Sequence, residues 1–390
     1  MSINIYHIRN GKDILSGESF EQQRNQVGQF LKAHIKSQNL NFLIGSGCSL
    51  PAVSLMGDTF KKLREQYFKL ETSCDGNDKE ASNEEEKLDK EYLGDFVEGK
   101  DIEAYLNWLN HAMQFHKEGE DYKEYEKAFN IVKKGLISSM PDRYILEDSP
   151  KKSDEEDKLD VTLTNYKKFY TSIFKHREYN VTQPINIFTT NYDLFNEVTL
   201  ENLGIHYTNG FKGTVQRLFD PSMFHLRLVD DANRYKEKWD TVRKFVKLFK
   251  IHGSVDWSYD EASKKVLQRD VSHSSQENVL IYPTINKHIE TQQTPYSELF
   301  RELTNNIQKK DTTLIVIGYG FPDQHINHLL SQALSNPSFN LIVLGKKEEP
   351  NASEFIKNNK DFVNFHFIGG SLNEGECNGH HFENVIDYLN

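Results

Sequence analysis

Short apolar runs alternate along the chain with segments whose apolar residues recur at helical spacing. The apolar runs are residues 40–44, 185–189, 249–251, 279–282, 314–317 and 341–344. Helical spacing is found at residues 18–40, 295–308 and 325–334. Strands that alternate with helices are typical of a parallel sheet, because each parallel connection needs a crossover. The pattern therefore predicts the α/β class, with a Rossmann-like parallel sheet flanked by helices.

A helical block separates the first two predicted strands. Helical spacing begins near Thr59 and returns over residues 92–140 and 161–179. Between these parts, the charged stretches 75–91 and 149–160 are predicted to be loops. We therefore predict one sheet domain over residues 1–390, with a helical insertion at residues 60–182.

Composition narrows the class of protein. The chain of 390 residues has 47 Lys+Arg against 58 Asp+Glu, and this net charge of -11 argues against direct binding to a nucleic-acid backbone. No run of 18 apolar residues occurs, and the first residues lack the pattern of a signal peptide. Three scattered cysteines are too few for a disulfide framework or a four-cysteine zinc site. We expect a cytoplasmic protein without a membrane segment.

Four polar segments each follow a predicted strand. They are Gly45–Ser49, Thr189–Asp193, Ile251–Ser254 and Gly318–Asp323. Because the carboxyl ends of parallel strands meet at one edge of a sheet, these segments predict a single nucleotide site. The glycines of the first segment would let a phosphate approach backbone N–H groups, although an ordinary strand-to-helix turn also explains them.

Each of the other segments also has two interpretations. The amide of Asn191 can bind ribose hydroxyls or a water, but Asn191 or Asp193 could instead cap the helix that follows. The imidazole of His252 can take a proton near neutral pH, but a lone histidine often has a structural hydrogen-bonding role. In the segment Gly318–Asp323, the two glycines permit close approach of a ligand, whereas its aspartate could cap the next helix.

Two groups of histidines could in principle bind a metal ion. His325 and His328 are three residues apart on a predicted helix, and Cys377, His380 and His381 lie near the C-terminus. Neither group has a further ligand with a supporting pattern. We predict no metal site.

In this order, the four segments resemble the sirtuin-like (SIR2-like) family, and more closely its bacterial NADase branch in antiphage defence. The resemblance covers about residues 38–58 and 183–370 and implies that NAD is the substrate. It implies that Asn191 and His252 are the catalytic pair. The residues that it places near NAD are Gly45, Ser46, Gly47, Ser49, Thr190, Asp193, Gly318, Tyr319 and Gly320, with the first glycine turn near the pyrophosphate and the last near the adenosine.

Two departures from the sirtuin deacylases favour NAD hydrolysis over deacylation. Those enzymes carry a four-cysteine zinc module, for which this chain lacks the cysteines, so no zinc is expected. They also follow the glycine turn with Pro-Asp-Phe-Arg, whereas residues 55–60 here read Leu-Met-Gly-Asp-Thr-Phe.

The length and the helical insertion resemble the defence subunit that is paired with a HerA-type ATPase (helicase). The resemblance implies a ring-like homo-oligomer, with a dodecamer as one expected form, and contact with nucleic acid only through the ATPase. Two alternatives remain: a non-catalytic scaffold that binds NAD or ADP-ribose, and a metal-dependent nuclease subunit. The nuclease requires clustered carboxylates, but the densest acidic runs fall in predicted loops.

Overall fold

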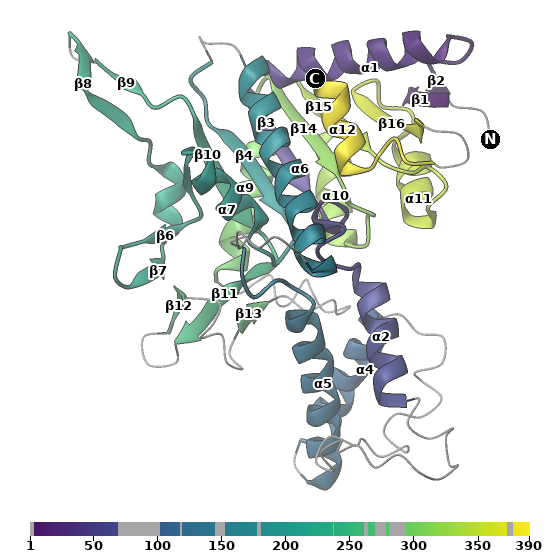
Figure 1. Cartoon of the computed structure of the whole chain (residues 1–390), viewed down its shortest axis with the longest axis vertical. Coiled ribbons are helices and arrows are strands. Elements are labelled where there is room, and N and C mark those ends of the chain that lie inside the picture. Colours follow the sequence, from purple (N-terminus) through teal and green to yellow (C-terminus); the bar gives the residue numbers. More distant parts are fainter. Residues whose placement is uncertain are drawn as a thin grey trace. The chain divides into compact units, whose positions relative to one another are not determined.

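The computed structural model describes residues 4–68, 102–117, 119–144, 153–177, 181–236, 238–260, 264–269, 278–280, 294–372 and 377–390. These residues divide into two compact units (Figure 1). The first unit contains the main sheet, and the described residues of the second lie between Ala52 and Arg143. None of the helices among the described residues combines the length and apolar character that a membrane crossing requires.

In the described part of the first unit, nine strands form one sheet in the order β2-β1-β16-β15-β14-β3-β4-β10-β5. All neighbours from β16 to β5 are parallel, while β1 and β2 are antiparallel at one edge. The strands are β1 (Asn4–Arg9), β2 (Lys12–Asp13), β3 (Asn39–Ile44), β4 (Ile185–Thr189), β5 (His206–Thr208), β10 (Phe245–Lys250), β14 (Thr312–Ile317), β15 (Phe339–Leu344) and β16 (Phe365–Ser371). The predicted α/β class and Rossmann-like sheet are confirmed.

The central strands were predictable because both of their faces are covered. Every residue of β4 and β14 is buried, as a strand between two helical layers requires. The predicted run 249–251 is the end of β10, which begins earlier, at Phe245. The predicted run 279–282 overlaps β13 (Asn278–Leu280), which belongs to another sheet, and its remainder falls outside the described residues.

The order of connections places a topological switch point between β3 and β14. From β3 the chain extends the sheet through β4 to β10, whereas β14, β15 and β16 extend it in the opposite direction. Open α/β sheets bind ligands at the carboxyl ends of the strands beside such a point. The register aligns these ends, because Ile44 pairs with both Ile317 and Thr189, and Thr189 pairs with Lys250.

Helices α1 (Phe20–Ile35), α6 (Asp154–His176) and α12 (Phe382–Leu389) pack against one another over the sheet. Phe169 of α6 contacts Phe42 of β3 edge to face. The other helices of this unit that the structure describes are α7 (Phe195–Asn202), α9 (Tyr296–Ile307), α10 (Gln324–Ala333) and α11 (Pro350–Asn359), with short 3-10 helices η1 (Ser46–Ser49) and η4 (Pro221–His225). The predicted helices at 295–308 and 325–334 are confirmed, and so is the helix predicted at 18–40, although it ends at Ile35 and residues 39 and 40 belong to β3.

The predicted loop at residues 149–160 is wrong from residue 154 onward, because α6 begins there. Ser153 and Glu156 form a capping box, in which each side chain binds the other's backbone N–H group. The acidic residues 154–157 lie in the first turn, where the helix dipole favours negative charge. The charge that suggested a loop is therefore an N-terminal helix signal.

A second sheet begins where the main sheet ends. Its strands, in spatial order, are β13, β11 (Gly253–Asp260), β12 (Lys265–Gln268), β7 (Arg217–Phe219) and β6 (Phe211–Lys212). A separate ribbon joins β8 (Val229–Tyr235) and β9 (Lys238–Thr241). Only Ile251 and His252 separate β10 from β11, so His252 lies where the chain passes from one sheet to the other.

In the second unit, the described residues include three helices that pack around a core of their own. They are α2 (Met56–Phe68), α4 (Ile102–His116) and α5 (Glu120–Ser138). Their buried contacts involve Phe60, Tyr105, Leu106, Leu109, Val132 and Leu136. The predicted helices near Thr59 and within 92–140 are confirmed where the structure describes them, and the predicted loop 75–91 falls outside the described residues. Within the predicted insertion 60–182, α6 belongs to the first unit.

Three histidines cluster around Phe30 at the antiparallel edge of the main sheet. His7 on β1 and His366 on β16 are buried, and His7 Nε2 lies 2.9 Å from His366 Nδ1. The ring of Phe30 contacts His7, His34 and His366. Burial lowers the pKa of His7 to about 4 and that of His366 to about 3. The folded chain therefore holds both rings neutral under mildly acidic conditions.

This cluster predicts a loss of stability in acid. Below pH 6.5 the unfolded chain protonates these histidines and the folded chain does not, so the free energy of unfolding falls as the pH falls toward 4. His366→Asn, which keeps an acceptor for His7, should reduce that fall by roughly 2–3 kcal/mol. Urea unfolding between pH 7 and pH 4 measures it, with the exposed His206→Asn as control. An unchanged pH dependence in His366→Asn would contradict this prediction.

Candidate active site

The ends of β3 and β14 approach each other through glycines. Gly45 N donates to Ile317 O and Gly47 N donates to Gly318 O, each at 2.9 Å. A Cβ on Gly45 would lie 2.3 Å from Gly318 O, and one on Gly47 would lie 2.9 Å from Gly318 Cα. The close approach of the two backbones therefore requires glycine on both sides. The N–H groups of Gly45 and Gly47 thus already donate to the chain itself, whereas Ser46, between them, is exposed to solvent.

The amide of Asn191 is held in one orientation at the end of β4. Its Nδ2 donates to Gly45 O at 3.0 Å and to Ser49 Oγ at 2.9 Å. Its backbone N–H donates to Thr189 Oγ1 at 3.0 Å. Asn191 Oδ1 is buried and accepts no hydrogen bond from the described residues. A buried acceptor without a donor is uncommon in proteins, so this oxygen is available to a ligand.

Ser49 joins the turn after β3 to the segment after β4. Its Oγ donates to Asp193 Oδ2 at 2.6 Å, and the hydroxyl of Tyr166 lies 3.4 Å away. Asp193 Oδ1 accepts from Phe195 N, the first residue of α7, at 3.2 Å. Burial raises the pKa of Asp193, while Lys250 and the bond from Ser49 oppose that rise. Asp193 thus binds the start of α7 as expected, and the Asn191 side chain makes no such bond.

Lys250, the last residue of β10, is fully buried beneath this segment. Its ammonium donates to Tyr192 O at 3.2 Å and to Asp193 O, and it lies 3.3 Å from Glu197 Oε1. The two carboxylate oxygens of Glu197 accept no hydrogen bond from the described residues. Burial raises the pKa of Glu197 to about 7, and the charge of Lys250 limits this rise. Lys250 therefore both fixes the backbone beside Asn191 and balances a buried carboxyl group.

His252 lies beside this cluster because of the sheet register. Its strand pairs Lys250 with Thr189, and Ile251 N donates to Thr189 O at 3.0 Å, so His252 follows β10 as Asn191 follows β4. The side chain is buried, and Nε2 lies 3.8 Å from Asp323 Oδ1. The Asp323 carboxylate therefore faces the imidazole of His252.

Asp323 occupies the predicted N-cap position of α10, but its side chain makes no capping hydrogen bond. Asp323 Oδ2 instead accepts from the hydroxyl of Tyr319 at 3.3 Å, and Oδ1 faces His252. The segment after β14 is turned by Gly318 and Phe321, whose φ angles are +65° and +59°. The Tyr319 hydroxyl therefore orients a carboxylate that the predicted site omitted.

The structure brings most of the predicted site residues to one edge of the sheet. Hydrogen bonds or direct backbone contacts link Gly45, Gly47, Ser49, Asn191, Asp193 and Gly318. Thr190, directly after β4, donates its N–H to Ile44 O at the end of β3, at 3.2 Å. Gly320 is exposed near Glu349. Four further residues of this edge were not predicted: Lys250, Glu197, Tyr166 and Asp323. The one local signal for any of them was the lysine within the apolar run Phe249–Ile251.

The histidine groups considered for metal binding have other surroundings. The ring of His325 lies 5.0 Å from that of Phe300, and the rings of His380 and His381 are 4.8 Å apart. Over the residues that the structure describes, no three His, Cys, Asp or Glu side chains are grouped to hold a metal ion.

Comparison with known families gives one match. Residues 185–362 match the family model described as "SIR2-like domain". The matched region contains Asn191, Asp193, His252 and the segment Gly318–Asp323, and the glycine turn after β3 precedes it. No curated protein matches the chain. The family match and the Rossmann-like sheet together support a SIR2-like family for this region, and with it an NAD-related activity.

Proposed function

We propose that this chain cleaves the bond between nicotinamide and ribose in NAD+, and so releases nicotinamide and ADP-ribose. The observation that carries the proposal is the buried Asn191 Oδ1, which has no donor among the described residues and belongs to an amide that binds the turn after β3, beside the switch point of the sheet. His252 follows the neighbouring strand in matching register. An amide acceptor beside a basic side chain fits a sugar whose hydroxyls donate hydrogen bonds.

Cleavage of this bond does not require an acid catalyst to protonate the leaving group. The pyridinium of NAD+ is cationic and leaves as neutral nicotinamide, so the site must stabilise an oxocarbenium-like ribose and deliver a water. His252 would accept a proton from a ribose hydroxyl or from that water, and Asp323 would stabilise the resulting imidazolium. Asn191 would orient the ribose and the water through Oδ1.

The remaining predicted residues would hold the rest of the dinucleotide. The turn Gly45–Ser49 would lie near the pyrophosphate, where the exposed hydroxyl of Ser46 could donate a hydrogen bond to it. Thr190 and Asp193 would lie near the nicotinamide ribose, and Gly318, Tyr319 and Gly320 near the adenosine. The three cysteines of the chain give no support to a zinc-dependent deacylase.

We further propose that the activity serves bacterial antiviral defence in the cytoplasm, in a ring-like homo-oligomer gated by a HerA-type ATPase. An enzyme that consumed NAD without restraint would harm its own cell. The basal rate should therefore be low, and assembly with the ATPase should raise it.

Product analysis tests this function. The purified chain is incubated with NAD+, with and without the ATPase, and the products are separated by chromatography. We expect nicotinamide and ADP-ribose in equal amounts, and cyclic ADP-ribose would instead indicate ring closure rather than attack by water. Saturable binding of NAD+ without release of nicotinamide under any condition would favour the non-catalytic scaffold.

A further inference from the structure

The ribbon of β8 and β9 has a free edge on each side. Figure 1 shows the two strands lying side by side, and among the described residues no third strand pairs with either of them. An isolated pair of strands is only marginally stable in water, and an unpaired edge offers N–H and C=O groups to another chain. The ribbon is therefore a surface where a further strand can add to the sheet.

The edge of β9 is the better template for such a strand. The register between the two strands shifts within β8, and an irregularity of this kind hinders pairing at an edge. Val242, directly after β9, donates its N–H to Leu228 O, and the hydrogen-bonded pairs of an antiparallel ladder alternate from there. The backbone N–H and C=O groups of Trp239 and Thr241 therefore point away from β8.

One register makes β9 complementary to a second copy of itself. When two copies run antiparallel about a two-fold axis at Trp239, Lys238 of each copy lies opposite Asp240 of the other. The two Trp239 residues then exchange backbone hydrogen bonds, and each Lys238–Asp240 pair takes the closer, non-hydrogen-bonded position. A lysine on an edge usually discourages pairing, but in this register it meets a carboxylate. The charges of β9 thus fit a second copy of the same strand.

The opposite face of β9 adds an apolar contact. Trp239 is 44 % exposed, and Val229 of β8, which pairs with Thr241, is 48 % exposed. Alternate residues of a strand share a face, and so do residues paired across two strands. Trp239 and Val229 therefore lie on the face away from Lys238 and Asp240. In the two-fold register the two Trp239 side chains lie opposite each other, as aromatic pairs that stabilise a sheet do.

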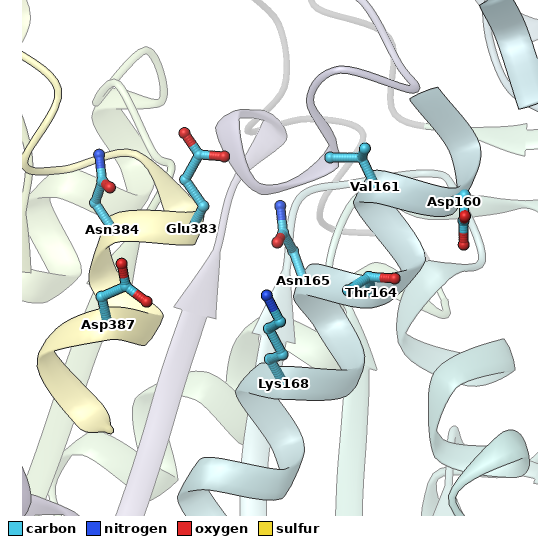
Figure 2. Close-up of a pocket in the computed structure, with 8 residues that line it drawn as sticks. All are labelled: Asp160, Val161, Thr164, Asn165, Lys168, Glu383, Asn384 and Asp387. Atoms are coloured by element: carbon cyan, nitrogen blue, oxygen red, sulfur yellow. The ribbon is translucent and has the colours of Figure 1, made fainter. Parts of the chain in front are cut away.

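The surface between α6 and α12 offers a second copy no such apolar contact. It holds a pocket of about 400 Å³, and the side chains that line this pocket are polar or charged apart from Val161 (Figure 2). The core of a protein interface is depleted of charged residues, so this surface suits a second copy less well than the ribbon does.

We propose that the edge of β9 pairs with the same edge of a second copy of this chain. The two ribbons then form one four-stranded sheet in the order β8-β9-β9-β8, with the same surface used on both copies. No residue of the candidate active site takes part, so this contact and the NAD+ reaction proposed above are tested separately.

Charge reversals test the register, with the mass of the full chain in solution measured by sedimentation equilibrium. Lys238→Glu and Asp240→Lys each place like charges opposite each other in both pairs, and each should weaken the association of two copies about tenfold. An equimolar mixture of these two variants should associate as the wild type does, because every pair between unlike copies again has opposite charges. The double variant Lys238→Glu/Asp240→Lys should also regain the wild-type association by itself.

Asp231→Lys is the matched control, because it makes the same change in charge as Asp240→Lys at an exposed position of β8. It should leave the association unchanged. Thermal unfolding should give similar temperatures for all variants, because the replaced side chains are exposed. The proposal is overturned if the wild-type chain remains a monomer or if the single reversals on β9 leave its association unchanged. It is also overturned if mixing them restores nothing, or if Asp231→Lys weakens the association as much as they do.

Discussion

His252→Ala is expected to lower the rate of NAD+ hydrolysis about 10²–10⁴-fold, the usual contribution of a general base. Asn191→Ala is expected to lower it about 10²–10³-fold, the effect of losing one preorganised polar contact to the reacting centre. The two side chains follow adjacent strands in the same register, and the protein uses both amide hydrogens of Asn191 but not its oxygen. The loss in His252→Ala should fall on kcat, because the turn proposed to bind the pyrophosphate keeps its hydrogen bonds from Asn191, whereas Asn191→Ala should also raise KM, because it removes these two hydrogen bonds.

Release of nicotinamide in the presence of the ATPase measures these effects, with His328→Ala as the control. His328 is an exposed histidine of α10, so its removal should not change the rate. Asn191→Ala also removes the donor to Gly45 O and Ser49 Oγ, which is expected to destabilise the fold by about 1–3 kcal/mol. Rates are therefore compared only at temperatures where thermal unfolding shows each variant to be folded. Wild-type activity in His252→Ala would remove the proposed base.

The strands that carry the candidate site could be predicted because burial on both faces leaves a continuous apolar run. Each such run then stops at glycine or at a polar residue, which indicates where the sheet edge lies. Strand β11 was missed because its sequence, Gly-Ser-Val-Asp-Trp-Ser-Tyr-Asp, lacks such a run, although its first six residues are all buried. Strand β16 was missed because Gly369 and Gly370 weaken its strand propensity.

The partners within the site could not be predicted from local sequence. The need for glycine at position 45 comes from the carbonyl of Gly318, which is distant in sequence and adjacent only through the order of the strands. The same holds for Asp323, whose position predicts a helix cap and whose carboxylate instead faces His252. Such pairings depend on sheet order and register, which a single sequence does not reveal.

Lys250→Met is expected to destabilise the folded chain by about 3–5 kcal/mol, the cost of breaking a buried ion pair by removing one partner. The variant leaves Glu197 buried without a compensating charge, and it leaves Tyr192 O and Asp193 O without their lysine donor. The cost should depend on pH, because the pKa of Glu197 is already about 7 in the presence of Lys250 and would rise further without it. A carboxyl group with a raised pKa stabilises the folded state at low pH and loses that effect as the pH rises. Lys250→Met should therefore be more stable at pH 6 than at pH 8.

Chemical denaturation at the two pH values, with a second-site change, distinguishes charge from packing. Lys250→Met/Glu197→Gln should regain part of the lost stability at pH 8, because no buried charge remains, whereas the exposed Lys357→Met should behave as wild type. Neither Lys250 variant should regain NAD+ hydrolysis in full, because the backbone of Tyr192 and Asp193 also positions Asn191 and no longer has its donor. Recovery of stability without recovery of the rate would show that this lysine holds the site in shape in addition to balancing Glu197. A pH-independent loss that the second change does not reduce would show that the ion pair is not what stabilises this edge of the sheet.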